Sequence, residues 1–194
     1  MSRIRSDGLL LGEWACLGIL SVQQTHGFAI AARLGANGDV GRVWSLSRAL
    51  TYRALDQLGE RGLVRTVGEE PGIAGGNRTI LAPTTKGRKE LAKWLQTPVA
   101  HLRDLRSELL LKLILGGLRN IDPFPLLVAQ REQIAAQSEA LDAQVDDLDP
   151  GRDVVALWRS ESSRGAMRFL DRLIEGSVVA QGHADERGDG DHQP

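Results

Sequence analysis

Residues 45–89 read SLSRALTYRALDQLGERGLVRTVGEEPGIAGGNRTILAPTTKGRK. Residues that favour strands follow at 63–67 and 79–81, with Gly and Pro between them at 71–76, which predicts a two-stranded ribbon. A helix that leads into such a ribbon, with another helix beginning after it, is the order of a winged helix-turn-helix module. The first helix is predicted from leucines that recur at helical spacing and can face a core: Leu46, Leu50, Leu55 and Leu58.

The same helix leaves basic and hydrogen-bonding side chains for its other face. Ser47 is a good N-cap, because its hydroxyl can accept from a backbone N–H at the start of the helix. A helix with one buried and one basic face fits the major groove of DNA, whereas Thr51 and Tyr52 have an alternative as capping or packing residues. The expected DNA-contacting residues on the helix and just past the ribbon tip are Ser47, Arg48, Thr51, Tyr52, Arg53, Asn77 and Arg78.

Two motifs resemble those of the PadR family of transcriptional regulators. Residues 46–55, LSRALTYRAL, are similar to the family's recognition helix, and residues 76–87, GNRTILAPTTKG, are similar to its wing. The chain departs from the family pattern at Ala49, where Gly is usual, and at Thr79, where Lys is usual. Without the wing lysine, the chain lacks at least one contact with the DNA backbone that the resemblance implies.

The resemblance extends over most of residues 8–178 and implies a DNA-binding regulator. On this reading the chain is a repressor that is released from double-stranded operator DNA by a small aromatic or amphipathic effector. Indole rings are suitable stacking surfaces for such a molecule, although each has an alternative as a core residue. The candidate effector-binding residues are Trp14, Trp94 and Trp158.

The expected fold class is mainly α, with the winged helix-turn-helix followed by a helical dimerisation domain. Pro98 ends a helix that begins after Thr85, and the composition then changes to long helical periods. We therefore predict a DNA-binding domain over residues 8–98 and a C-terminal helical domain over residues 104–178. Residues 181–194 are rich in Gly, Asp and His, which predicts a disordered tail.

The helical half contains more apolar surface than a single small domain readily buries. We expect the surplus, at 105–118 and 154–174, to form a homodimer interface. A monomer with a compact three-helix cap is the alternative. The interface residues predicted on this basis are Leu109, Leu110, Leu113, Ile114, Leu170, Leu173 and Ile174.

The charge of the chain is unevenly distributed. The 194 residues have a formal net charge of −1, but residues 1–94 contain 13 Lys and Arg against 8 Asp and Glu. The remaining residues contain 11 Lys and Arg against 17 Asp and Glu. A positive half attracts phosphates whatever the overall charge, although the asymmetry has an alternative as a chance fluctuation.

Several classes of protein are disfavoured by the sequence. Cys16 is the only cysteine, which rules out a disulfide framework within the chain and predicts a small buried residue. The four histidines show no metal-ligand spacing, and no catalytic or phosphate-cradling motif is present. We expect no metal, no cofactor, no enzymatic activity and no membrane span, and a cytoplasmic protein. Two alternatives stay open: a winged-helix protein–protein adaptor and a small-molecule-binding protein without DNA binding.

Overall fold

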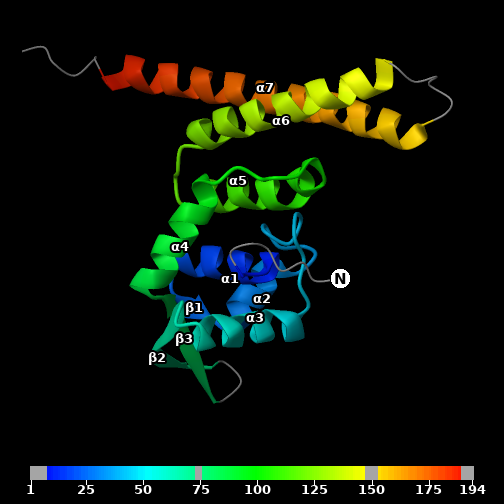
Figure 1. The fold of residues 1–194 in the computed structure, drawn as a ribbon. Coiled ribbons are helices and arrows are strands. Elements are labelled where there is room, and N and C mark those ends of the chain that lie inside the picture. Colours follow the sequence, from blue (N-terminus) through cyan, green and yellow to red (C-terminus); the bar gives the residue numbers. More distant parts are fainter. Residues whose placement is uncertain (1–7, 73–75, 147–152, 189–194) are drawn as a thin grey trace, which may run out of the picture. The chain divides into compact units, whose positions relative to one another are not determined.

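The computed structural model describes residues 8–72, 76–146 and 153–188 (Figure 1). The chain forms two compact units. Unit 1 comprises the residues up to Thr97 together with Arg106–Ile121, and unit 2 comprises Pro98–Leu105 together with the residues from Asp122 onward. Residues 106–121 therefore belong with the winged helix, and not with the C-terminal domain to which the sequence assigned them.

Unit 1 is a winged helix with one additional helix. Its second helix leads through a long loop into the recognition helix, and the loop folds back so that Leu46 N donates to Leu34 O at 2.9 Å. Gly41 in this loop is required sterically, because a Cβ atom there would lie 1.8 Å from Gly35 O. The elements of unit 1 are α1 (Leu11–Val22), β1 (Thr25–His26), α2 (Gly27–Leu34), α3 (Arg48–Glu60), β2 (Val64–Pro71), β3 (Asn77–Pro83), α4 (Thr85–Gln96) and α5 (Leu110–Gly117).

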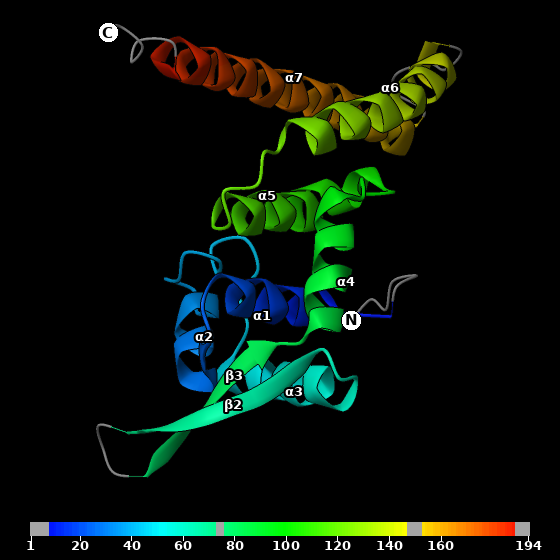
Figure 2. The same ribbon diagram turned by 90° about the vertical axis from the view of Figure 1, so that its left-hand side faces the viewer.

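The wing is a three-stranded antiparallel sheet in the order β1–β3–β2. The sequence predicted only the two long strands, because β1 has two residues and too short a pattern to be recognised. β1 pairs with β3 so that His26 lies opposite Ile80, and the β2–β3 pairing contains a bulge between Thr66 and Gly68. The ribbon lies at the same end of unit 1 as α3, away from α5 (Figure 2).

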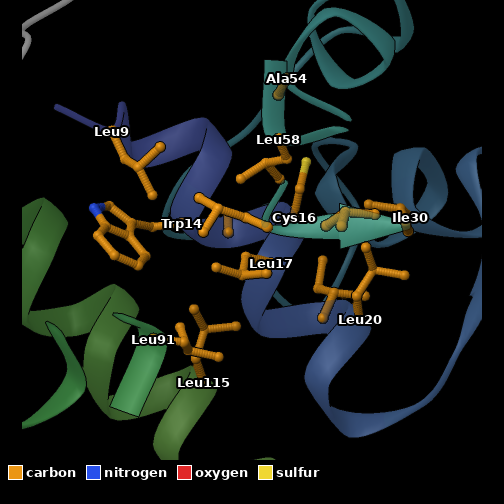
Figure 3. Close-up of a cluster of buried hydrophobic side chains, with 14 of the residues drawn as sticks. Leu9, Trp14, Cys16, Leu17, Leu20, Ile30, Ala54, Leu58, Leu91 and Leu115 are labelled. Carbon is orange, nitrogen blue, oxygen red and sulfur yellow. The ribbon is translucent and has the colours of Figure 1, made fainter. Parts of the chain in front are cut away.

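α1 is the central helix of the unit 1 core, with nine consecutive buried residues from Gly12 to Leu20. It contacts α2, α3, α4, α5 and β3. Cys16 is fully buried in this core, as the sequence predicted, and burial raises the pKa of its thiol to about 12 (Figure 3). The thiol is therefore protonated at neutral pH and serves as a small apolar group.

α5 follows two short irregular turns, a 3₁₀ turn at Leu102–Asp104 and a π-helical turn at Leu105–Leu109. It packs on α1 and α4, and its Leu111 and Leu115 are fully buried in the unit 1 core. Part of the apolar surplus at 105–118 is therefore buried within the chain's own first unit, which the sequence could not show because α1 and α5 are far apart in the chain.

Unit 2 contains α6 (Phe124–Asp146) and α7 (Val154–Gly188), which pack against each other. The side chain of Gln130 pairs with the backbone of Val99 through both its oxygen, at 2.6 Å, and its nitrogen, at 3.0 Å. Residues 181–188, which the sequence assigned to a disordered tail, continue α7, and residues 189–194 lie outside the described part of the chain. None of the helices in the described ranges combines the length and apolar composition that a membrane span requires.

Candidate nucleic-acid interface

The exposed face of α3 contains most of the predicted DNA-contacting residues. Ser47 caps the helix as expected: its hydroxyl accepts from Leu50 N at 3.3 Å. Arg48 and Arg53 are exposed, and the side chain of Tyr52 is 44% exposed. Leu55 and Leu58 face the core on the opposite side. The helix thus presents two arginines and a phenol to solvent.

Thr51 and Leu50 correct the predicted orientation of this helix. Thr51 is fully buried, and its hydroxyl donates to Ser47 O at 3.1 Å, so it packs within unit 1 and cannot contact DNA. Leu50, which was expected to face the core, is 51% exposed. The buried residues of α3 are Thr51, Ala54, Leu55 and Leu58, at positions i, i+3, i+4 and i+7, so Thr51 lies within the buried stripe and Leu50 lies outside it.

The start of α2 supports the exposed face of α3. The Arg48 guanidinium lies 4.7 Å from the centre of the Phe28 ring, a cation–π contact between the two helices. The Tyr52 ring lies close to Gly27, where an added Cβ would be 2.9 Å from Tyr52 Cε1. Two of the exposed side chains of α3 are therefore positioned by residues at the start of α2.

The wing joins the same surface through a contact between β1 and β3. Arg78 Nη1 lies 3.3 Å from His26 Nε2, and His26 Nδ1 accepts from Ala29 N at 3.1 Å as the N-cap of α2. Asn77 is exposed, and its amide donates to Glu69 Oε2 at 2.8 Å within the ribbon. The ribbon tip, residues 73–75, lies outside the described residues.

Sequence reasoning missed His26 and Phe28 as parts of this surface. A histidine directly before a glycine-led helix was the available signal, because a side-chain acceptor at that position caps a helix.

The three tryptophans proposed to bind an effector are not brought together. Trp14 and Trp94 are almost completely buried in unit 1 and stack on each other, so neither ring is available to a ligand. Trp158 lies in unit 2 and is 73% exposed. Two of the three residues are core residues, which was the alternative reading of the sequence.

The predicted dimer residues also divide into two groups. Leu109 and Leu170 are fully buried within the chain, so they are not available to a partner subunit. The remaining residues are half-buried: Leu110, Leu113, Ile114, Leu173 and Ile174. At the start of α7, Val154 and Trp158 are exposed, whereas Ala156, Ser160 and Ser163 are buried.

A shallow hollow of about 420 Å³ lies between α5 and the loop after α2. Its lining combines apolar residues with one acidic and one basic residue. The lining residues are Asp39, Arg42, Leu113, Ile114, Gly117 and Leu118. In the described ranges, no group of three side chains is arranged to hold a metal ion.

Comparison with known proteins gives structural likeness without sequence matches. No family model matches the chain, and no curated protein matches it by sequence. Bacillus subtilis PadR in complex with operator DNA is 18% identical with a TM-score of 0.43, over 84% of this chain and 97% of that one. The same protein in complex with p-coumaric acid is 18% identical with a TM-score of 0.38, over 87% of this chain and 96% of that one.

A third similar structure is the Vibrio cholerae virulence activator AphA. It is 22% identical with a TM-score of 0.38, over 91% of this chain and 99% of that one. Operator DNA and p-coumaric acid are ligands of Bacillus subtilis PadR. For this chain, the ligand has to be inferred from its own surface.

Proposed function

We propose that this chain is a DNA-binding transcriptional regulator in which α3 enters the major groove and the wing contacts the neighbouring backbone. One observation carries the proposal: contacts between elements join α3, the start of α2 and β3 into a single basic surface. Arg48 rests on Phe28, Tyr52 rests on Gly27, and Arg78 meets His26. Each side chain is thus held in place before any ligand arrives.

The distribution of charge supports this proposal. The first 94 residues, with 13 Lys and Arg against 8 Asp and Glu, contain the whole of the proposed interface. Glu69 and Glu70 in β2 are exposed and would repel phosphates near them. We therefore place the wing contact at Arg78 on β3, and expect β2 to contribute little.

A gel shift with the DNA upstream of the chain's own gene, at two salt concentrations, tests this function. A regulator gives a sequence-preferring shift that weakens as salt rises, because cations are released from the phosphates it contacts. Arg53→Gln, on the exposed face of α3, should weaken binding. If no duplex is shifted at low salt, DNA binding is excluded and a winged-helix adaptor becomes the better proposal.

We propose further that two copies form a homodimer, since two half-sites about 34 Å apart raise affinity and specificity beyond those of one winged helix. Exposed apolar residues on α7 support this: Val154, Val155, Trp158 and Phe169. Three of them, Val154, Trp158 and Phe169, follow helical spacing and share one face. Sedimentation of the wild type and of Trp158→Glu tests the idea. A monomeric wild type contradicts it, and a dimer that Trp158→Glu disrupts supports it.

For the mode of regulation, we propose repression with release by a small amphipathic acid. Binding to an operator is enough to block transcription, so repression requires no second interaction surface on the protein. We place the effector in the hollow beside α5, because Leu113, Ile114 and Leu118 give its lining an apolar part and Arg42 also lines it. A reporter assay and release of bound DNA by p-coumaric acid, with Arg42→Gln as the control variant, test this. Increased transcription on DNA binding contradicts repression, and release unaffected by Arg42→Gln contradicts this site.

A further inference from the structure

The imidazole of His26 occupies a position where its hydrogen bonding is restricted. Its Nδ1 accepts from Ala29 N at 3.1 Å, so Nδ1 carries a lone pair and no proton. A neutral imidazole has one acceptor nitrogen and one donor nitrogen, which means that Nε2 carries the proton. The N-cap of α2 therefore fixes the tautomer of this ring.

The fixed tautomer determines the hydrogen-bonding roles of the two nitrogens in the contact between His26 and Arg78. His26 Nε2 and Arg78 Nη1 lie 3.3 Å apart, and both are donors once Nδ1 is occupied. Neither can accept from the other. Two adjacent N–H donors without an acceptor between them form the arrangement that binds an anionic oxygen.

The sheet register keeps this pair together. His26 lies opposite Ile80, and Arg78 is two residues from Ile80 on the same face of β3. Glu70 lies opposite Arg78 on β2 and could supply a competing carboxylate. Within residues 8–72, 76–146 and 153–188, Arg78 nevertheless forms no ion pair, and its polar side-chain contact is with His26.

We propose that His26 and Arg78 form a two-donor clamp for one phosphate oxygen of the DNA backbone, with Nε2–H as a neutral donor and the guanidinium as a charged one. This inference rests on the proposed DNA-binding function and names a contact within it. The clamp lies where β1 pairs with β3, next to the Phe28–Arg48 pair. It anchors the wing and fixes the register of α3 in the groove.

Two substitutions of His26 distinguish the effect of its Nε2 donor from the effect of its Nδ1 acceptor, which caps α2. Asparagine is a strong N-cap, so His26→Asn keeps an acceptor for Ala29 N while removing the Nε2 donor. His26→Ala removes both. Thermal unfolding should leave His26→Asn close to the wild type and His26→Ala lower, which shows that loss of binding in His26→Asn is not loss of fold.

The test measures the affinity for a labelled duplex that the wild-type protein shifts, as a function of salt. His26→Asn should weaken binding about fivefold with an unchanged salt slope, because a neutral donor releases no counterion. Arg78→Gln should weaken binding and reduce the slope by about one. The double variant should lose less than the product of the two single effects, since both donors serve one oxygen.

A duplex series with single methylphosphonate replacements identifies the phosphate. At one position, the neutral linkage should abolish the difference between wild type and His26→Asn. Wild-type affinity in His26→Asn on the unmodified duplex overturns the clamp and leaves the proposed function standing. Failure of the wild type to bind any duplex overturns the function itself.

Free phosphate is the other source of such an anion. Inorganic phosphate should displace DNA no better than chloride at equal ionic strength. Displacement by millimolar phosphate that is lost in His26→Asn would overturn the assignment to the DNA backbone.

Discussion

The indole rings of Trp14 and Trp94 lie nearly parallel, with their centroids 4.8 Å apart and their planes inclined by 7°. This stack joins α1 to α4. Trp94 also donates from Nε1 to Glu108 Oε1 at 3.1 Å, and Lys112 Nζ lies 4.9 Å from the centre of its ring. The two rings and the buried charges beside them therefore hold α5 to the winged helix.

Replacement of Trp94 should separate the contribution of the stack from that of the hydrogen bond. Trp94→Phe keeps an aromatic ring on Trp14 and removes the indole N–H, which should lower the free energy of unfolding by about 1–2 kcal/mol. Trp94→Ala also opens a cavity and should cost about 3–5 kcal/mol. Urea unfolding measures both. Equal losses in the two variants would contradict a role for the stack.

Glu108 and Lys112 form a buried ion pair at 2.9 Å, with side chains only 5% and 1% exposed. Lys112 Nζ also donates to Thr97 O at 2.5 Å. Glu108→Gln removes the carboxylate and should reduce the free energy of unfolding by about 3 kcal/mol, because the buried Lys112 ammonium loses the attraction of this carboxylate. In the double variant Glu108→Gln, Lys112→Met the buried charge is gone, so much of this loss should be recovered. A double variant less stable than Glu108→Gln would show that the pair is not the source of the effect.

Local chemistry made the centre of the fold predictable. Ser47 is an N-cap that can be recognised from its type and position, and the ribbon was expected from strand-forming residues on either side of a Gly- and Pro-rich turn. Leu55 and Leu58 were expected to face the core from their helical spacing, and both are buried in it.

The errors arose where tertiary contacts decide the outcome. Thr51 is buried because its hydroxyl is satisfied by Ser47 O, which allows a polar residue on the inner face. α5 was assigned to a dimer interface because nothing in its own sequence shows that α1 covers it. His26 was missed because its contact is with Arg78, which is 52 residues away in the chain.

The ionised Asp39 should contribute to the free energy of unfolding at neutral pH, and this contribution should be lost in acid. Two hydrogen bonds from the Arg33 guanidinium, to Oδ1 at 3.0 Å and to Oδ2 at 2.5 Å, hold the pKa of this carboxyl below its ordinary value. A carboxyl whose pKa is lower in the folded state than in the unfolded state stabilises the fold at pH values above its unfolded-state pKa. This stabilisation is lost as the pH falls through the folded-state pKa.

Asp39→Asn should therefore be less stable than the wild type at pH 7, and the difference should shrink in acid. Because the pair is partly exposed, the difference should be no more than about 1 kcal/mol. Urea unfolding at pH 7, at pH 5 and below about pH 3 measures it. A difference that grows toward acid would contradict the assigned direction of the pKa shift.

Tyr52 and Thr51 are neighbours in α3 with opposite environments, so they form a matched pair of substitutions. Tyr52 is 44% exposed on the face that we propose enters the groove, whereas Thr51 is fully buried. Tyr52→Ala should weaken binding to the upstream duplex about tenfold, as expected for loss of one contact of 1–3 kcal/mol, with little change in stability. Thr51→Val should lower stability by about 1 kcal/mol through the lost hydrogen bond and leave the affinity of the folded protein unchanged. Anisotropy titration and urea unfolding on both variants measure these effects, and the reverse pattern would mean that α3 presents its other face to DNA.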